Sequence, residues 1–225
     1  MWFNNFKLIS KENLTQNVFL LIYESENDFS IIPGQFITFI LPKTWFARAY
    51  SVLFKEWKKC YFIIKRLENG RWWSIEICDY EVGVVLKWIW PTGRFVDSKM
   101  QNNKLFIWTG TWMVPLYYMI RNLLENWFWK NIKLILWNRE NKDLYYIKEF
   151  DEFKKKFHNF DFEIFLSHQN HNIYNNWRVT SFLTKENILK FDEFYLCGNP
   201  YMVDDSIKIL QGFWINDEKI FREKY

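Results

Sequence analysis

Three short segments of the chain combine turn-forming residues with polar side chains directly after apolar runs. They are Thr109-Gly110-Thr111 ahead of Pro115, then Asn138-Arg139, then Cys197-Gly198-Asn199-Pro200. At the carboxyl ends of parallel strands, loops and helix N-termini present backbone N–H groups to phosphates. The three segments therefore predict a phosphate-binding edge. A tight turn capping a helix explains Thr-Gly-Thr equally well, and Arg139 on its own also fits a surface charge.

A fourth segment, Arg48-Ala49-Tyr50-Ser51, lies on a strand-like run nearer the N-terminus. A guanidinium binds phosphate through two parallel hydrogen bonds, and a tyrosine ring offers a flat face to a planar ligand. Taken alone, these polar side chains more often serve packing and surface roles than binding.

The first part of the chain, up to about Val96, consists of short apolar runs separated by turn signals. The runs lie at 18–24, 34–41, 49–54, 60–67, 74–78 and 82–89, with Pro33-Gly34, Pro42, Asn69-Gly70 and Pro91-Thr92-Gly93 between them. Six short strands at this spacing predict a small antiparallel barrel or sandwich.

After Val96, strand-like and helical runs alternate. Strands are expected at 105–110, 132–137, 162–167 and 191–198, and helices at 114–126, 143–157, 180–189 and 202–212. This alternation is typical of a parallel sheet with helices on both faces. The polar segment 97–103 marks the boundary, so we expect a two-domain β + α/β chain with domains at 1–98 and 99–225.

Composition argues against several classes of protein. The net charge of +4 gives a mildly basic surface without the dense stripe of a nucleic-acid binder. Cys60, Cys78 and Cys197 lack the paired spacing of zinc or iron–sulfur sites, so we expect no metal. No apolar run approaches the roughly 20 residues that cross a bilayer, and no charged leader precedes an apolar stretch. We therefore expect a cytoplasmic protein that binds neither nucleic acid nor membrane.

The tryptophan content is abnormal, because the chain has 14 Trp and only 7 Gly. Glycine makes up about 3% of the chain, where roughly 7% is usual. Trp57, Trp137 and Trp214 stand at positions that read as turns. Turns with positive φ favour glycine over an indole.

Five motifs, in order along the chain, resemble those of the ferredoxin-NADP reductase superfamily. They are ARAYSV, ENGRWWS, WPTGRF, TGTWMVP and CGNPYMV, followed by a terminal EKY. The resemblance covers nearly the whole chain. It implies an N-terminal antiparallel FAD-binding β-barrel, then a parallel-sheet, Rossmann-like NAD(P)-binding domain, with FAD and NADP (or NAD) as cofactors.

For FAD, the resemblance implies that Arg48 holds the pyrophosphate, that Tyr50 stacks on the flavin and that Ser51 hydrogen-bonds near its reactive edge. The hydroxyl of Ser74 would take the other phosphate, together with the backbone N–H groups of the preceding Trp72 and Trp73.

For the nicotinamide nucleotide, the implied pyrophosphate loop contains Thr109, Gly110, Thr111, Trp112 and Pro115. Cys197, Gly198 and Pro200 match the segment beside the nicotinamide, where hydride passes to the flavin. Tyr225 would cover the flavin until the nicotinamide displaces it, and a frayed terminus is the alternative. Ser51, Cys197 and Tyr225 are thus the residues expected nearest the chemistry.

The coenzyme preference depends on the loop after the third strand of the second domain. Superfamily members that prefer NADPH hold its 2'-phosphate there with basic residues and a Ser. Ser167 matches that Ser, whereas His168 stands where Arg is usual and also fits a solvated loop histidine. Arg139 and Arg178 are further candidate phosphate ligands, so we expect NADPH rather than NADH.

Departures from the superfamily motifs fall on one residue type. Trp stands where the superfamily has Gly in GRWWS, LKWIWPTGRF, IWTGTWMVP, LILWNR and NNWRVTSFL. An indole is poorly suited to a loop whose backbone must approach phosphate. We interpret the pattern as a decoding effect, because some bacteria read UGA as glycine and another code reads it as tryptophan. UGG codons at the 14 positions would contradict this interpretation.

The expected function is that of an FAD-dependent NAD(P)H oxidoreductase. It would transfer hydride between nicotinamide and flavin N5 and pass electrons on to a ferredoxin or flavodoxin. One alternative is a flavin electron-transfer subunit of a larger enzyme. The other is a cofactor-free binding protein, which follows if the tryptophans are genuine and block both sites.

Overall fold

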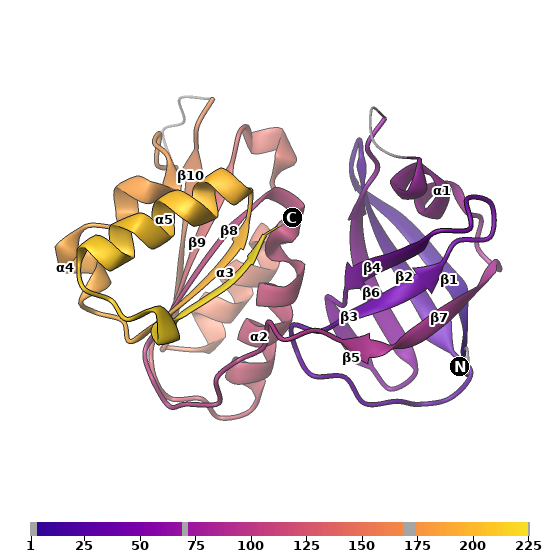
Figure 1. Ribbon diagram of the computed structural model, residues 1–225, viewed down its shortest axis with the longest axis horizontal. Coiled ribbons are helices and arrows are strands. Elements are labelled where there is room, and N and C mark those ends of the chain that lie inside the picture. The colour runs from indigo at the N-terminus through magenta and orange to yellow at the C-terminus, as the bar shows by residue number, and fades with distance from the viewer. Residues whose placement is uncertain (1–3, 69–71, 169–173, 225) are drawn as a thin grey trace. The chain divides into compact units, whose positions relative to one another are not determined.

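The computed structural model describes residues 4–68, 72–168 and 174–224. The chain divides into two compact units, of which the first ends at Asp97 and the second begins at Ser98, with Tyr117–Met119 grouped with the first. This division lies next to the expected boundary after residue 98. Each unit has its own sheet (Figure 1).

The first unit is an antiparallel, barrel-like sheet of seven strands in the order β4-β3-β7-β1-β2-β6-β5. Its elements are β1 (Asn4–Thr15), β2 (Val18–Ser25), β3 (Phe36–Ile40), β4 (Ala47–Ser51), β5 (Phe54–Glu56), β6 (Lys59–Lys65), α1 (Trp73–Asp79) and β7 (Val85–Thr92). Alternate residues of the strands face a core rich in aromatic rings. Phe6 stacks on Trp88 there with ring centroids 4.7 Å apart.

Residues 74–78, expected as a strand, instead form helix α1. The alternation of polar and apolar residues in SIEIC mimics a strand. The helix turns the carboxylate of Glu76 toward the loop that follows β3, where it accepts hydrogen bonds from the backbone N–H groups of Lys43 and Thr44. These contacts join residues more than thirty positions apart, and tertiary contacts of this kind override local propensity.

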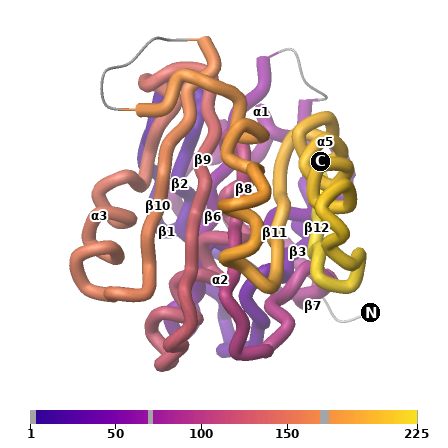
Figure 2. Tube along the Cα trace, turned by 90° about the vertical axis from the view of Figure 1, so that its left-hand side faces the viewer, coloured from indigo at the N-terminus to yellow at the C-terminus, as the bar shows by residue number. Residues whose placement is uncertain are grey.

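The second unit is a five-stranded parallel sheet in the order β10-β9-β8-β11-β12 (Figure 2). The strands are β8 (Lys104–Thr109), β9 (Ile132–Asn138), β10 (Phe160–Leu166), β11 (Glu193–Gly198) and β12 (Ile220–Lys224). The longer helices are α2 (Val114–Glu125), α3 (Ile147–Lys156) and α5 (Pro200–Gly212), with the single turn α4 (Lys185–Ile188). Short 3-10 turns lie at Gly110–Met113, Asn141–Asp143, Val179–Phe182 and Asp217–Lys219.

Helices cover both faces of this parallel sheet, as the alternation predicts. On one face, Met202, Val203 and Leu210 of α5 pack with Leu105 and Ile107 of β8. On the other face, the ring of Phe150 in α3 lies 5.4 Å from that of Trp108. The expected fold class is therefore confirmed. Strand β12 was not expected, because its five residues read as a charged tail.

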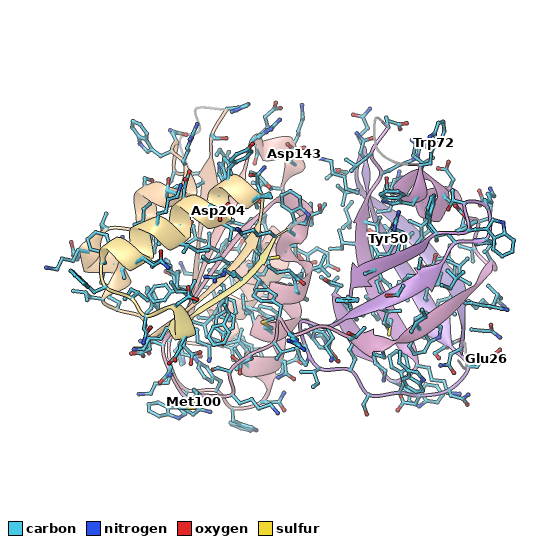
Figure 3. The ribbon with its side chains drawn as sticks, viewed as in Figure 1. Glu26, Tyr50, Trp72, Met100, Asp143 and Asp204 are labelled. Carbon is cyan, nitrogen blue, oxygen red and sulfur yellow. The ribbon has the colours of Figure 1, made fainter. Side chains whose placement is uncertain are left out.

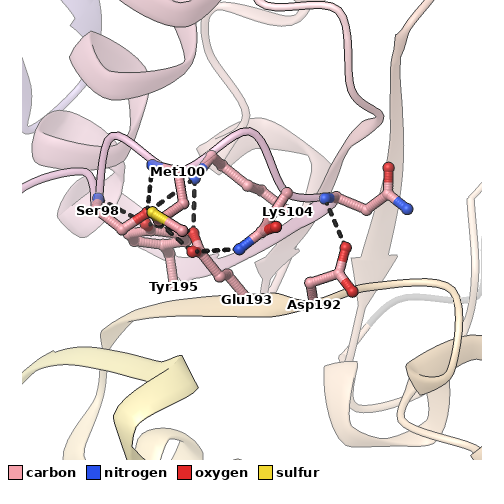
Figure 4. Close-up of polar contacts among 8 residues, drawn as sticks. Ser98, Met100, Lys104, Asp192, Glu193 and Tyr195 are labelled. Carbon is pink, nitrogen blue, oxygen red and sulfur yellow. Dashed lines mark hydrogen bonds and ion pairs between the residues drawn. The ribbon is translucent and has the colours of Figure 1, made fainter.

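A buried ion pair links the N-terminal ends of β8 and β11 (Figure 4). Lys104 and Glu193 are register partners, and Lys104 Nζ lies 2.6 Å from Glu193 Oε2, with both side chains buried. The Ser98 hydroxyl and the Asn102 amide also donate to the Glu193 carboxylate, at 2.8 and 3.0 Å. Tyr195 donates its O–H to Glu193 and accepts from the Ser98 backbone N–H. The network thus fixes the segment that leads into the second sheet.

Among the described residues, no helix is long and apolar enough to span a membrane. No group of three His, Cys, Asp or Glu side chains in the described part of the chain is placed to hold a metal ion.

Candidate functional site

The carboxyl ends of β8 and β11 lie side by side and are joined by a side-chain hydrogen bond. The Thr109 hydroxyl, at the end of β8, accepts from the backbone N–H of Asn199 at 3.0 Å. A Cβ at Gly198 would lie 2.3 Å from that hydroxyl oxygen, so only glycine fits there. The two expected loops therefore meet at one edge of the sheet, as parallel strands require.

Asn138 joins the loop after β8 to the loop after β9. Its Oδ1 accepts from the Gly110 backbone N–H at 3.0 Å, and its Nδ2 donates to the Asp143 carbonyl at 3.1 Å. Gly110 has a φ of 58°, a conformation that glycine adopts without strain. The amide of Asn138 thus holds the backbone of the Thr-Gly-Thr turn in place.

The remaining residues expected in the pyrophosphate loop follow directly. Thr111 and Trp112 belong to the 3-10 turn Gly110–Met113, and both are partly buried. Pro115 is buried in the first turn of α2, where its missing N–H costs nothing.

The loop after β11 begins helix α5. The Asn199 side chain accepts from the Tyr201 backbone N–H at 2.9 Å, and Pro200 occupies the first helical position. This is a capped N-terminus of a thirteen-residue helix, placed beside the Thr109 turn.

A cavity of about 480 Å³ opens at the ends of β9 and β10. Its lining contains all three residues expected to bind the 2'-phosphate, together with an imidazole, an amide and two indoles: Trp137, Arg139, Ser167, His168, Asn176, Trp177 and Arg178. Backbone bonds from Ser167 to Asn138 and from His168 to Arg139 bring the two strand ends together. Within the described part of the chain, the buried Ser167 hydroxyl has no hydrogen-bond partner.

The cavity therefore presents two guanidinium groups, together with a hydroxyl that has no partner in the described part of the chain. Arg139 and Arg178 are exposed at its rim. Guanidinium groups and hydroxyls are the groups that bind phosphate oxygens. The residues present fit the phosphate of a nicotinamide dinucleotide.

Cys197 lies in β11 and is fully buried. Burial raises the pKa of its thiol well above the ordinary value. The thiol is therefore neutral at physiological pH. Tyr225, the other expected residue of this region, lies outside the described residues.

In the first unit, strand β4 carries Arg48, Tyr50 and Ser51 (Tyr50 is labelled in Figure 3). The Tyr50 hydroxyl and the Arg48 Nε are buried atoms without a hydrogen-bond partner among the described residues. Burial raises the pKa of Tyr50, so its hydroxyl stays protonated. Such unpartnered polar atoms fit a polar ligand that supplies the missing partners.

The tryptophans flank this expected FAD site. The Arg48 guanidinium carbon lies 3.5 Å from the ring centroid of Trp73 and 4.9 Å from that of Phe46. Trp72 is the N-cap residue of α1, is 74% exposed and makes no capping hydrogen bond through its side chain. The Ser74 hydroxyl accepts from the Leu67 backbone N–H at 3.2 Å. The polar groups on β4 thus fit FAD, while the Trp73 ring covers the guanidinium face.

Sequence reasoning named the end of β9 but selected only Arg139 from it. Asn138 carries the contacts to the Thr-Gly-Thr turn. An amide side chain at the end of an apolar strand, where two loops must be joined, is the signal that could have identified it.

Comparisons with known proteins agree on the kind of domain. Residues 106–208 match the family model of the oxidoreductase NAD-binding domain. One component of the Na(+)-translocating NADH-quinone reductase of Neisseria gonorrhoeae is 29% identical over 147 residues, which are 60% of this chain and 36% of that protein. The toluate 1,2-dioxygenase electron transfer component of Pseudomonas putida is 23% identical over 205 residues, or 89% of this chain and 60% of that one.

Two solved structures have the same fold over almost the whole chain. A cytochrome P450 reductase from Amycolatopsis superposes with a TM-score of 0.88 at 20% identity, covering 99% of this chain and 69% of that one. A ferredoxin NADP+ reductase from Neisseria gonorrhoeae, with bound FAD and NADP, gives 0.84 at 17% identity and covers 99% and 98%. The chain spans about a third to three fifths of the length of the two curated relatives.

Proposed function

We propose that this chain is an FAD-dependent NAD(P)H oxidoreductase, because it has a ferredoxin reductase-like fold and its residues 106–208 match the family model of the oxidoreductase NAD-binding domain. In this proposal residues 1–98 bind FAD and residues 99–225 bind the nicotinamide dinucleotide. Bound FAD supplies a hydride acceptor that can release electrons one at a time. A ferredoxin or flavodoxin would receive them.

The proposal assigns the binding roles to named side chains. Arg48 and Tyr50 would hold the FAD pyrophosphate and flavin, with Ser51 near the reactive edge. The turn Gly110–Met113 and the start of α5 would border the pyrophosphate of the dinucleotide, because helix N-termini attract anions. Cys197, Gly198 and Pro200 would border the nicotinamide.

The observation that carries the coenzyme preference is the cavity lined by Arg139, Ser167 and Arg178. Two positive charges, with a hydroxyl that has no partner among the residues described, suit the 2'-phosphate of NADPH better than the neutral ribose of NADH. The three free cysteines fit a reducing compartment, so a cytoplasmic location remains part of the proposal.

The test is steady-state oxidation of NADPH and NADH with ferricyanide as acceptor, after flavin absorbance has shown bound FAD. Arg178→Gln removes a charge-assisted hydrogen bond, so KM for NADPH rises about 10- to 100-fold. KM for NADH stays unchanged. The matched control is Lys208→Gln on α5, which removes an exposed charge away from the cavity. Equal effects of Arg178→Gln on both coenzymes would refute the assignment.

A second candidate function is that of an electron-transfer subunit within a larger enzyme. It is favoured by the names of the two curated relatives, a subunit and an electron transfer component. Co-purification of a second polypeptide with the flavoprotein from native cells separates this candidate from the free reductase.

A further inference from the structure

Five tryptophans adopt a backbone conformation that suits glycine. Within the described part of the chain, seven non-glycine residues have positive φ, and five of them are Trp45, Trp57, Trp72, Trp127 and Trp214, with φ between 42° and 62°. Tryptophan is only 14 of the 225 residues. A Cβ in this region is strained, whereas glycine enters it freely.

No packing offsets this strain, because all five indoles face solvent. Their exposed fractions are 82%, 68%, 74%, 94% and 92% in chain order. A large apolar side chain that stays in water gains no burial free energy. Neither the backbone nor the side chain therefore explains an indole at these positions.

Two of the five occupy the helix-ending position that glycine dominates. After α5, the Trp214 N–H donates to Gln211 and the Ile215 N–H donates to Leu210, which is the bond pair of a Schellman motif. After α2, the Phe128 N–H donates to Leu123 in the same way, which places Trp127 in the left-handed position.

Trp57 occupies a tight hairpin turn. Glu56 and Lys59 are paired ends of β5 and β6, so Trp57 and Lys58 form a two-residue loop. Only the first loop residue has positive φ. Hairpins of this type take glycine at that first position.

We infer that positions 45, 57, 72, 127 and 214 hold glycine in the protein that the cell makes, encoded by a codon that the cell reads as glycine and that another genetic code reads as tryptophan. The backbone geometry supports this independently of the superfamily motifs, because only Trp72 of the five lies in one of them. It is independent of the proposed function.

The decisive test is to sequence the gene and to identify the peptides of the native protein. UGA at all five codons, with glycine in the peptides of protein purified from the source cells, supports the inference. UGG codons, or tryptophan in those peptides, overturn it.

A second test uses recombinant protein that contains tryptophan. The double variant Trp127→Gly/Trp214→Gly raises Tm by several degrees, because two strained residues are relieved. The matched control is Trp129→Gly, an indole that is 65% exposed at ordinary φ, which leaves Tm unchanged or lower. No rise in the double variant would overturn the geometric argument.

A different observation concerns Asn138. Its amide joins the Gly110 turn to the Asp143 loop, and its carbonyl accepts from the Ser167 N–H at 3.2 Å. One buried residue therefore holds three loop ends: the phosphate turn, the loop after β9 and a wall of the cavity. We propose that Asn138 is the positioning residue that sets the distance between the pyrophosphate turn and the 2'-phosphate cavity. This inference rests on the proposed function.

Asn138→Ala releases the Gly110 amide, so KM rises about 3- to 10-fold for both NADPH and NADH while kcat changes little. Asn138→Asp keeps an acceptor for Gly110 and restores part of the loss. The control Asn126→Ala removes an exposed amide that bonds to Asn122 within the end of α2. A wild-type protein that oxidises neither coenzyme refutes the proposed function. An active wild type with unchanged KM in Asn138→Ala refutes only the role of Asn138.

Discussion

The buried ion pair of Lys104 and Glu193 makes a strong prediction for stability. Lys104→Met removes the cation and leaves the Glu193 carboxylate buried. Breaking such a pair on one side costs about 3–5 kcal/mol. Because Ser98, Asn102 and Tyr195 still donate to the carboxylate, we expect the lower end, about 3 kcal/mol. At roughly 2–4 °C per kcal/mol, Tm falls by about 6–12 °C.

The effect depends on pH with a defined sign. Burial raises the pKa of Glu193, but hydrogen bonds from Lys104, Asn102 and Ser98 outweigh burial and hold the pKa below the ordinary carboxyl value. The stabilisation is therefore present above the ordinary carboxyl pKa and is lost as pH falls through the folded-state value. The Tm difference between wild type and Lys104→Met narrows in acid.

The assay is thermal unfolding followed by circular dichroism at neutral and acidic pH. Lys208→Met, which removes an exposed lysine, is the matched control. The double variant Lys104→Met/Glu193→Leu recovers much of the loss, since an apolar pair leaves no buried charge. A Tm for Lys104→Met within about 2 °C of wild type, or a double variant below the single, would refute the reasoning.

Two further predictions concern binding and packing. Trp73→Gly uncovers the Arg48 guanidinium, so FAD should bind about 3- to 30-fold tighter in a fluorescence titration. The control Trp129→Gly should leave the affinity for FAD unchanged. Equal FAD affinities in the two variants would contradict the stacking argument. Gly198→Ala forces a Cβ against the Thr109 hydroxyl and costs about 1–3 kcal/mol in urea unfolding. Adding Thr109→Ala should restore part of that stability, and failure to do so would locate the strain elsewhere.

Much of the fold could be predicted from the residues because its signals are local. The alternation of β8, α2, β9 and α3 follows from apolar periodicity and from Gly and Pro at the boundaries. Helix α1 could not be predicted, because it depends on the Glu76 carboxylate meeting backbone N–H groups of a distant loop. Strand β12 pairs in parallel with β11, and its five residues alone give no strand signal.

The same distinction between local signals and tertiary contacts applies to the residues of the candidate site. Arg139, Ser167 and Arg178 could be grouped beforehand through the superfamily resemblance. Arg139 and Ser167 also follow neighbouring parallel strands, whose carboxyl ends share one edge. Asn138 and the Lys104–Glu193 pair could not be predicted, because their partners depend on strand order and register. The Trp73 ring on Arg48 likewise arises from packing between a helix and a strand.

Strands β8 and β11 are linked at both ends by side-chain contacts. At one end Lys104 and Glu193 form the buried ion pair, and at the other the backbone N–H of Asn199 donates to the Thr109 hydroxyl. A shift of one residue in the register of the two strands would break both the ion pair and the hydrogen bond. The central backbone amides of these two strands should therefore open only with the whole second unit and exchange hydrogen with solvent most slowly. The strands would then stay rigid when a ligand binds, and conformational change would be confined to the loops that follow β8 and β11.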